Sequence, residues 1–206
     1  MSESAARPRR RADALRNIEA ILDAAAVRLS YDADASMAEI AAEAGVGRMT
    51  LYGHFPSRRE LVDATIERTI AEGNGALEEV ELSGDARGAL CRLIASSWLL
   101  IAQIGSLMAA AQEELSPERM RELHERPSAR VDELIRRGQE DGVFRTDLPS
   151  SWLVTLLHLT MHGVAGEIRE GRIIHTDAAL VIASSVLAAY TTPGDRVPDV
   201  AKWLSA

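Results

Sequence analysis

The chain has 206 residues, of which 47% are hydrophobic and 4% aromatic, and its formal net charge is −8. This length allows one large or two small hydrophobic cores, and the apolar content excludes a disordered protein. Abundant alanine and few β-branched runs favour an all-α protein. The single cysteine, Cys91, excludes a fold held together by disulfides within the chain.

The N-terminal segment, residues 1–12, is basic, with four arginines around Pro8. We expect a flexible, solvated arm. No apolar stretch follows it, so it does not resemble a signal peptide, and no apolar run in the chain reaches the roughly 18 residues of a membrane span. These features lead us to expect a cytoplasmic protein. Residues 13–30 carry apolar side chains at helical spacing, which predicts the first helix.

The next segment, residues 36–61, predicts two short helices joined by a tight turn. Ser36 is a good N-cap, and Glu39 completes a capping box. Gly45 lies where the first helix has to end and the chain has to turn sharply, which glycine does without steric cost. The second helix is expected over 47–55, because a proline follows it. Helix, short turn and helix make the geometry of a DNA-binding helix-turn-helix.

The residues of this segment also match a longer signature. The run G-V-x-R-x-T-L-Y-x-H-F-x-S-R extends from Gly45 to Arg58. It resembles the signature of the TetR family, the tetracycline-repressor-like bacterial transcriptional regulators. The resemblance covers roughly the first third of the chain. It implies an N-terminal three-helix DNA-binding domain followed by a C-terminal helical bundle for ligand binding and dimerisation.

The second helix of this motif is the one expected in the major groove of DNA. A helical wheel turns Leu51 inward, and Arg48 is the side chain able to make a bidentate contact to guanine. Thr50, Tyr52 and His54 suit phosphate oxygens, as the family resemblance also implies. The complete set of expected DNA-binding residues is Ser36, Arg48, Met49, Thr50, Tyr52, Gly53, His54 and Arg58.

Two positions of this helix depart from the usual family pattern. Met49 stands where a small residue is more common, and Gly53 stands where a bulky or polar one is. Met49 suits a thymine methyl group, and Gly53 would let the backbone approach DNA closely. Arg58 replaces the family's usual lysine and is expected to hold phosphate at a helix N-terminus. The arm of residues 1–12 would order against phosphates or the minor groove.

The negative charge lies outside this segment. Residues 1–60 contain nine arginines and nine acidic residues, a net charge of zero, so residues 61–206 carry the whole −8. Because the acidic body repels phosphate, we expect modest non-specific affinity for DNA.

The rest of the chain predicts further helices. One begins at Ser57, with Glu60 completing a capping box, and ends near Val80. Gly73 and Gly75 weaken its second half, and we place the domain boundary near Gly73. The predicted division is a flexible basic arm (1–12), a helix-turn-helix domain (13–72) and a ligand-binding and dimerisation domain (73–206). Helices are also expected within 85–114, 116–126 and 126–140, from Pro149 to 171, and from a Thr176 cap over 177–190, before a tail anchored by Trp203.

The last long helix is apolar or small on almost every side between Ala178 and Ala189. Such a helix needs burial on most sides, which a partner subunit provides. The resemblance implies a homodimer through the helices at about 149–170 and 177–190. Two subunits related by a twofold axis suit a palindromic operator in double-stranded DNA.

The ligand pocket is expected inside the C-terminal bundle, by resemblance. Large or polarisable side chains in apolar surroundings are its candidate lining, although each is also consistent with plain core: Trp98, Met108, Gln112, Trp152, His158 and Met161. Few charged residues face inward, which favours a mainly apolar or aromatic effector.

Other chemistry finds little support in the sequence. His158 and His162 are four residues apart, close enough to share a metal ion, but the sequence indicates no third ligand. We therefore expect no metal site, and His124 and His175 to be surface residues. There is no phosphate loop, nucleophile elbow or cysteine–histidine cluster, so we expect no enzyme and no cofactor.

The prediction is a ligand-responsive transcriptional repressor that binds a palindromic operator as a homodimer and is released by a small, mainly apolar ligand. One alternative is a small-molecule sensor or carrier that has lost specific DNA binding, which Met49 and Gly53 would favour. Another is a helical enzyme that uses His158 and His162 with a metal. An activator in place of a repressor also fits the sequence.

Overall fold

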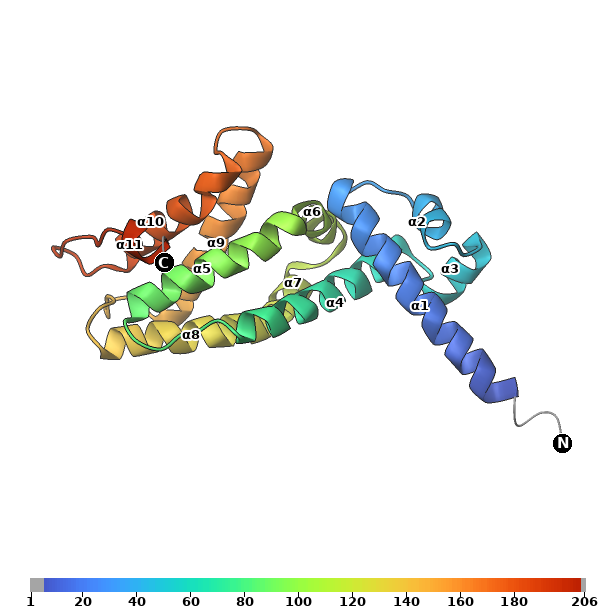
Figure 1. Ribbon diagram of the computed structural model, residues 1–206, viewed down its shortest axis with the longest axis horizontal. Coiled ribbons are helices and arrows are strands. Elements are labelled where there is room, and N and C mark those ends of the chain that lie inside the picture. The colour runs from blue at the N-terminus through green and yellow to red at the C-terminus, as the bar shows by residue number, and fades with distance from the viewer. Residues whose placement is uncertain (1–5, 205–206) are drawn as a thin grey trace. The chain divides into compact units, whose positions relative to one another are not determined.

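The computed structural model describes residues 6–204, with side chains from residue 12 onward. Within that range the chain folds into helices joined by short loops, with no strand, which confirms the all-α prediction (Figure 1). The helices are α1 (Ala6–Tyr31), α2 (Met37–Glu43), α3 (Arg48–His54), α4 (Arg58–Glu78), α5 (Ala86–Gln103), α6 (Gly105–Glu114), α7 (Pro117–Leu123), α8 (Glu125–Glu140), α9 (Ser150–Arg169), the 3₁₀ helix η1 (His175–Asp177), α10 (Ala178–Tyr190) and α11 (Ala201–Leu204).

The first helix begins earlier than the sequence predicts. Residues 6–12, expected to be irregular, belong to α1, so that expectation is wrong for them. Pro8 is compatible with this start, because proline is tolerated in the first helical turn, where the backbone N–H has no partner to lose. Residues 1–5 of the predicted arm lie outside the described residues.

The chain divides into two compact units. The first contains residues 6–72 and 104–123, and the second contains 73–103 and 124–204. The division at residue 73 coincides with the predicted domain boundary, but α6 and α7 pack with the N-terminal helices. The functional division into 13–72 and 73–206 stays a prediction.

The first unit has its own hydrophobic core. α1, α2, α3 and the first half of α4 contribute to it, and α6 adds fully buried side chains such as Leu107. α7 is joined to α4 by Arg119, whose guanidinium donates to Asp63 at 2.7 Å and to Glu67 at 3.0 Å. These contacts fix the helix-turn-helix within a larger helical unit.

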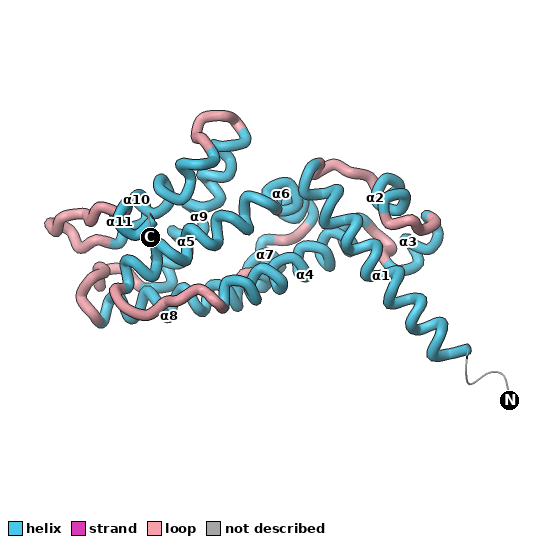
Figure 2. The backbone as a smooth tube through the Cα atoms, viewed as in Figure 1, coloured by secondary structure: helices cyan, strands magenta, loops and turns pink. Residues whose placement is uncertain are grey.

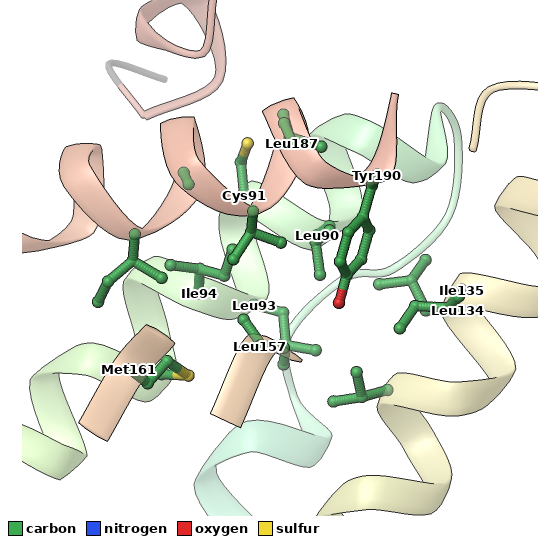
Figure 3. Packing of buried hydrophobic residues seen from close by; sticks show 14 of the residues in the cluster. Leu90, Cys91, Leu93, Ile94, Leu134, Ile135, Leu157, Met161, Leu187 and Tyr190 are labelled. Carbon is green, nitrogen blue, oxygen red and sulfur yellow. The ribbon is translucent and has the colours of Figure 1, made fainter. Parts of the chain in front are cut away.

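The second unit is built around a separate core of α5, α8, α9 and α10. Side chains from these four helices meet in one apolar cluster, which includes Leu93, Ile135, Leu157 and Tyr190 (Figure 3). The fully buried Tyr190 donates its hydroxyl to the carbonyl of Leu153. Since a buried hydroxyl without a partner is costly, this bond lets an aromatic alcohol occupy the core.

The loop of residues 79–85, between α4 and α5 (Figure 2), is held by arginines. Arg130 donates to the carbonyls of Leu77 and Val80, and Arg137 to that of Leu82. Arg92 donates to the carbonyls of residues 81 and 83, both at 2.9 Å. Carbonyls at a helix C-terminus lack partners within the helix, so these side chains explain an ordered connection without regular structure.

Several predicted boundaries are confirmed. α4 starts beside Ser57, whose hydroxyl accepts the N–H of Glu60 at 3.2 Å. α7 starts at Pro117, and the Ser116 hydroxyl accepts an N–H of its first turn at 3.2 Å. The tail is anchored as expected, because the Trp203 ring packs against Gly88 of α5, so closely that a β carbon there would lie 2.9 Å from the indole.

Other predicted boundaries are corrected. Thr176 does not cap the last long helix: it lies within η1, and α10 has Asp177 as its N-cap, without a side-chain capping bond. The helix boundary predicted at residue 126 is also displaced: α7 ends at Leu123 and α8 begins at Glu125, so Pro127 lies in the first turn of α8, where proline is tolerated. By contrast, the helix predicted from Ser57 to near Val80 is confirmed: α4 runs through Gly73 and Gly75 to Glu78, since a cost of about 1 kcal/mol for each glycine does not end a packed helix.

Among residues 6–204, no single helix is long and apolar enough to cross a membrane. The bent pair α5 and α6 passes the same test by length and composition alone.

Candidate nucleic-acid interface

α2 is held in place by the capping box that the sequence predicts. The Ser36 hydroxyl accepts the N–H of Glu39, and the Glu39 carboxylate accepts the N–H of Ser36 at 2.8 Å and its hydroxyl at 2.6 Å. These hydrogen bonds favour the ionised carboxylate and so lower the pKa of Glu39 below its ordinary value. The bond from the Ser36 side chain has the largest effect, followed by the bond from its backbone. Ser36 therefore positions α2, whatever else it contacts.

The turn between α2 and α3 depends on Gly45. Its φ is +65°, in the left-handed region that other residues adopt only at a cost. The next N–H, of Val46, returns to the carbonyl of Ala41 at 3.0 Å and closes the end of α2. Gly47, in extended conformation, is then the N-cap of α3. The turn observed is the one predicted from the sequence.

α3 has one buried side and one exposed side. Leu51 is fully buried, and Phe55 at its C-cap is 8% exposed. On the other side Met49 is 86% and Tyr52 47% exposed, large values for apolar side chains in a folded unit. Two large side chains kept in solvent on one short helix indicate a contact surface.

The remaining predicted contact residues lie on or beside this exposed side. Arg48 and Gly53 are exposed, whereas Thr50 and His54 are half-buried at its edges. A β carbon at Gly53 would meet nothing within 4 Å. The glycine is therefore not required by packing inside this unit, and it leaves the backbone of α3 open to an approaching partner.

Arg58 is engaged within its own unit. It donates to the carbonyls of Ala33 and Ala35, in the loop before α2, and pairs with Glu114 of α6 at 3.0 Å. Its side chain is only 27% exposed. The predicted phosphate contact would have to compete with these bonds, so the structure gives Arg58 an internal role that the sequence did not indicate.

Comparison with known proteins gives a family for this geometry. Residues 21–65, which cover the C-terminal part of α1, all of α2 and α3 and the start of α4, match the family described as bacterial regulatory proteins, tetR family. The transcriptional repressor LfrR of Mycolicibacterium smegmatis is 38% identical over 95 residues. That alignment spans 46% of this chain and 47% of LfrR, so the chain matches about half the length of this curated relative.

Solved structures extend the likeness beyond the N-terminal helices. The structure of the TetR-like regulator LfrR in complex with proflavine is similar with a TM-score of 0.64 and 25% identity, over 86% of this chain and 97% of that one. Residues 21–65 thus match the tetR family, and most of the chain is similar in fold to a TetR-like regulator. The fatty acid degradation regulator FadR of Bacillus halodurans, 18% identical, has the same fold with a TM-score of 0.66 over 84% of this chain and 94% of its own.

The six predicted ligand-lining residues do not form one group. Trp98 and Met161, both buried, share the core of the second unit, with His158 half-buried on the same helix as Met161. Trp152 is 48% exposed near the start of α9. Met108 and Gln112 belong to α6 in the first unit, where Met108 is buried in the core and Gln112 is exposed.

One histidine has surroundings that the sequence prediction missed. His124, expected to be a surface residue, lies between α7 and α8 with its ring centre 5.7 Å from that of His158 and 6.0 Å from that of His162. Burial lowers the pKa of His158 to about 4 and also lowers the pKa of His162. The neighbouring His124 is the second cause of both shifts. His175 is exposed as predicted, with its ring 5.6 Å from Trp98. No signal along the sequence joins His124 to α9.

Proposed function

We propose that this protein is a DNA-binding transcriptional regulator that acts as a homodimer. The observation that carries the proposal is the exposed side of α3, where Arg48, Met49, Tyr52 and Gly53 face solvent while Leu51 fixes the helix from behind. A short helix anchored in this way, after a tight glycine turn, fits the major groove of B-DNA. The family of LfrR, a transcriptional repressor, supports the same function.

Within this interface, Arg48 is the proposed base-reading residue. It is exposed in the first turn of α3, and the N-terminal residues of a recognition helix are the ones that reach base edges. Tyr52, Thr50 and His54 are proposed to contact phosphates and so to set the position of the helix. Met49 is proposed to contact a thymine methyl group.

The proposed dimer rests on α9 and α10, which lie side by side in the second unit (Figure 1). One side of α10 is buried in the core, but Leu180 on the other side is 45% exposed. Leu159 of α9 is 59% exposed. Apolar side chains left in solvent on two neighbouring helices are a surface that a second copy would cover.

The proposed effector is a small, mainly apolar or aromatic molecule bound in the second unit. Trp98 supports this, because it is 4% exposed and its indole N–H has no hydrogen-bond partner within residues 6–204. A buried donor of this kind favours a ligand that supplies an acceptor in apolar surroundings. The structure of LfrR with proflavine makes proflavine a suitable first probe.

We further propose that the protein represses transcription while it is bound to a palindromic operator, and that effector binding releases it from this operator. The alternative is a sensor or carrier that has lost specific DNA binding. The exposure of Met49 and Gly53, which reduces the polar groups available to bases, is the feature that would favour it.

The deciding experiment is selection of bound DNA from a random pool at near-physiological salt, with wild type and Arg48→Ala in parallel. We expect a palindromic site for wild type, and for Arg48→Ala a loss of preference at one base pair in each half-site. The matched control is Arg59→Ala, an exposed arginine outside α3. If the wild type enriches no sequence, either alone or with proflavine present, the result would favour the alternative of a sensor or carrier that has lost specific DNA binding.

A further inference from the structure

Met49 is the most exposed methionine in the described part of the chain. The residue is 86% exposed, whereas Met37, Met108 and Met161 are each at most 9% exposed. Met120 is half-buried and packs against the core of the first unit. A thioether is oxidised to a sulfoxide by an oxidant that reaches its sulfur. Among these side chains, Met49 is therefore the one that an oxidant in solution reaches first.

The single thiol of the chain does not compete for the same oxidant. Cys91 is fully buried in the core of the second unit. Burial raises the pKa of its thiol to about 11, because apolar surroundings disfavour the charged thiolate. The thiolate is the form that oxidants attack, so a thiol that is both protonated and inaccessible is inert at neutral pH. Oxidation is thereby directed to Met49.

Met49 also lies where a change in polarity affects DNA binding. It belongs to the first turn of α3, next to Arg48, on the exposed side of the helix. In the proposed complex its thioether contacts a thymine methyl group, which is an apolar contact. The sulfoxide is polar, and its oxygen accepts hydrogen bonds but donates none. Thymine O4 and the phosphate oxygens are acceptors as well, so they offer the sulfoxide no donor.

We propose that Met49 is an oxidation site through which a peroxide releases the protein from DNA. The inference rests on the proposed DNA-binding function. The sulfur lone pair bonds to one peroxide oxygen and the O–O bond breaks, so that hydrogen peroxide leaves one sulfoxide and one molecule of water. The thioether loses two electrons and the peroxide gains them. Methionine sulfoxide reductases reverse this step, which makes the change a switch.

The test treats the full-length protein with hydrogen peroxide and follows each methionine by peptide mass spectrometry. We expect Met49 to become the sulfoxide before Met108 and Met120 do. Fluorescence anisotropy with the DNA site selected by the wild type then measures affinity. Oxidation should weaken binding about 10-fold or more, because a polar group buried without a partner is costly. Treatment with methionine sulfoxide reductases should restore the affinity.

Met49→Leu is the matched variant, because leucine keeps an apolar side chain of similar volume and has no sulfur. It should bind the selected site as untreated wild type does, both before and after peroxide. Met120→Leu should remain as sensitive to peroxide as wild type. Met49→Gln, which places a polar group at the same position, should bind weakly without any oxidant.

Three results would overturn the inference. They are oxidation of Met108 or Met120 before Met49 in the folded protein, an unchanged affinity of the oxidised wild type, and an equal loss of affinity in peroxide-treated Met49→Leu. If the untreated wild type selects no DNA site, the proposed function fails and this inference fails with it. If the untreated protein binds its site and oxidation changes nothing, only this inference fails.

Discussion

The ring of Phe144 lies directly against the backbone of Gly138. A β carbon at position 138 would be 2.1 Å from Cδ2 of the ring and 2.4 Å from Cε2. The chain returns to this point because Gly142, with a φ of +69°, reverses its direction after α8. The N–H of Phe144 then donates to the carbonyl of Gly138 at 2.9 Å. Phe144 in turn meets Tyr190 edge to face, with ring centres 5.4 Å apart.

This contact predicts that Gly138→Ala destabilises the protein. The added methyl group has to displace a buried ring, which costs about 1–3 kcal/mol, while alanine returns up to about 1 kcal/mol of helix propensity. We expect a net loss of about 1–2 kcal/mol in the free energy of unfolding, measured with urea. Gly75→Ala is the control. Its β carbon meets nothing within 4 Å, and it should stabilise the protein or leave it unchanged.

Tyr190 predicts a loss of stability at alkaline pH. Burial raises the pKa of its phenol well above the ordinary value of 10.0, so the unfolded chain releases this proton first as pH rises. The free energy of unfolding should therefore fall above pH 10, by at most about 1.4 kcal/mol per pH unit from this residue. Urea unfolding of wild type and Tyr190→Phe at pH 9, 10 and 11 checks this. The stability advantage of wild type should shrink with pH, and an advantage that stays constant would contradict the assignment.

The internal bonds of Arg58 predict that Arg58→Met weakens the fold of the first unit. The variant leaves the carbonyls of Ala33 and Ala35 without this donor and Glu114 without its partner. We expect a loss of about 1–3 kcal/mol in thermal or urea unfolding. Arg59→Met, at an exposed neighbour, should change stability by less than about 0.5 kcal/mol. Weaker DNA binding by Arg58→Met at unchanged stability would instead assign Arg58 to phosphate.

Gly53→Ala is predicted to separate folding from DNA binding. The position is helical, exposed and open, so alanine should stabilise the protein by up to about 1 kcal/mol. If α3 approaches DNA closely here, the same methyl group should weaken binding to the selected site, as measured by fluorescence anisotropy. Gly45→Ala is the contrasting variant, because its positive φ makes alanine strained. It should lower both stability and binding.

The exposed side of α9 and α10 predicts the oligomeric state. Leu159→Glu, alone or with Leu180→Glu, should convert a dimer to a monomer in analytical ultracentrifugation, because a charge buried in an apolar interface is costly. Leu15→Glu on α1 is the control, since Leu15 is similarly exposed, at 54% against 59% for Leu159. A dimer that survives the double substitution would exclude this face as the interface.

The sequence by itself determined the local features of this protein. Caps, turns and proline positions act over a few residues, so Ser36, Gly45 and Pro117 placed three helix boundaries correctly. The run from Gly45 to Arg58 indicated the resemblance to the TetR family, whose model matches residues 21–65. The same local logic was wrong at Thr176, which has a good capping side chain but lies within η1. It was also wrong for residues 6–12, where a proline was compatible with the first turn of α1.

Only the tertiary structure decided which distant residues meet. It paired Arg58 with Glu114, placed Met108 in the core of the first unit, and brought His124 to His158 and His162. Sequence periodicity tells which side of a helix is apolar, but not which helix covers it, because apolar burial has no direction. Which helices pack against each other depends on how all of them pack at once. The proximity of His124 to His158 and His162 therefore could not be predicted from the sequence.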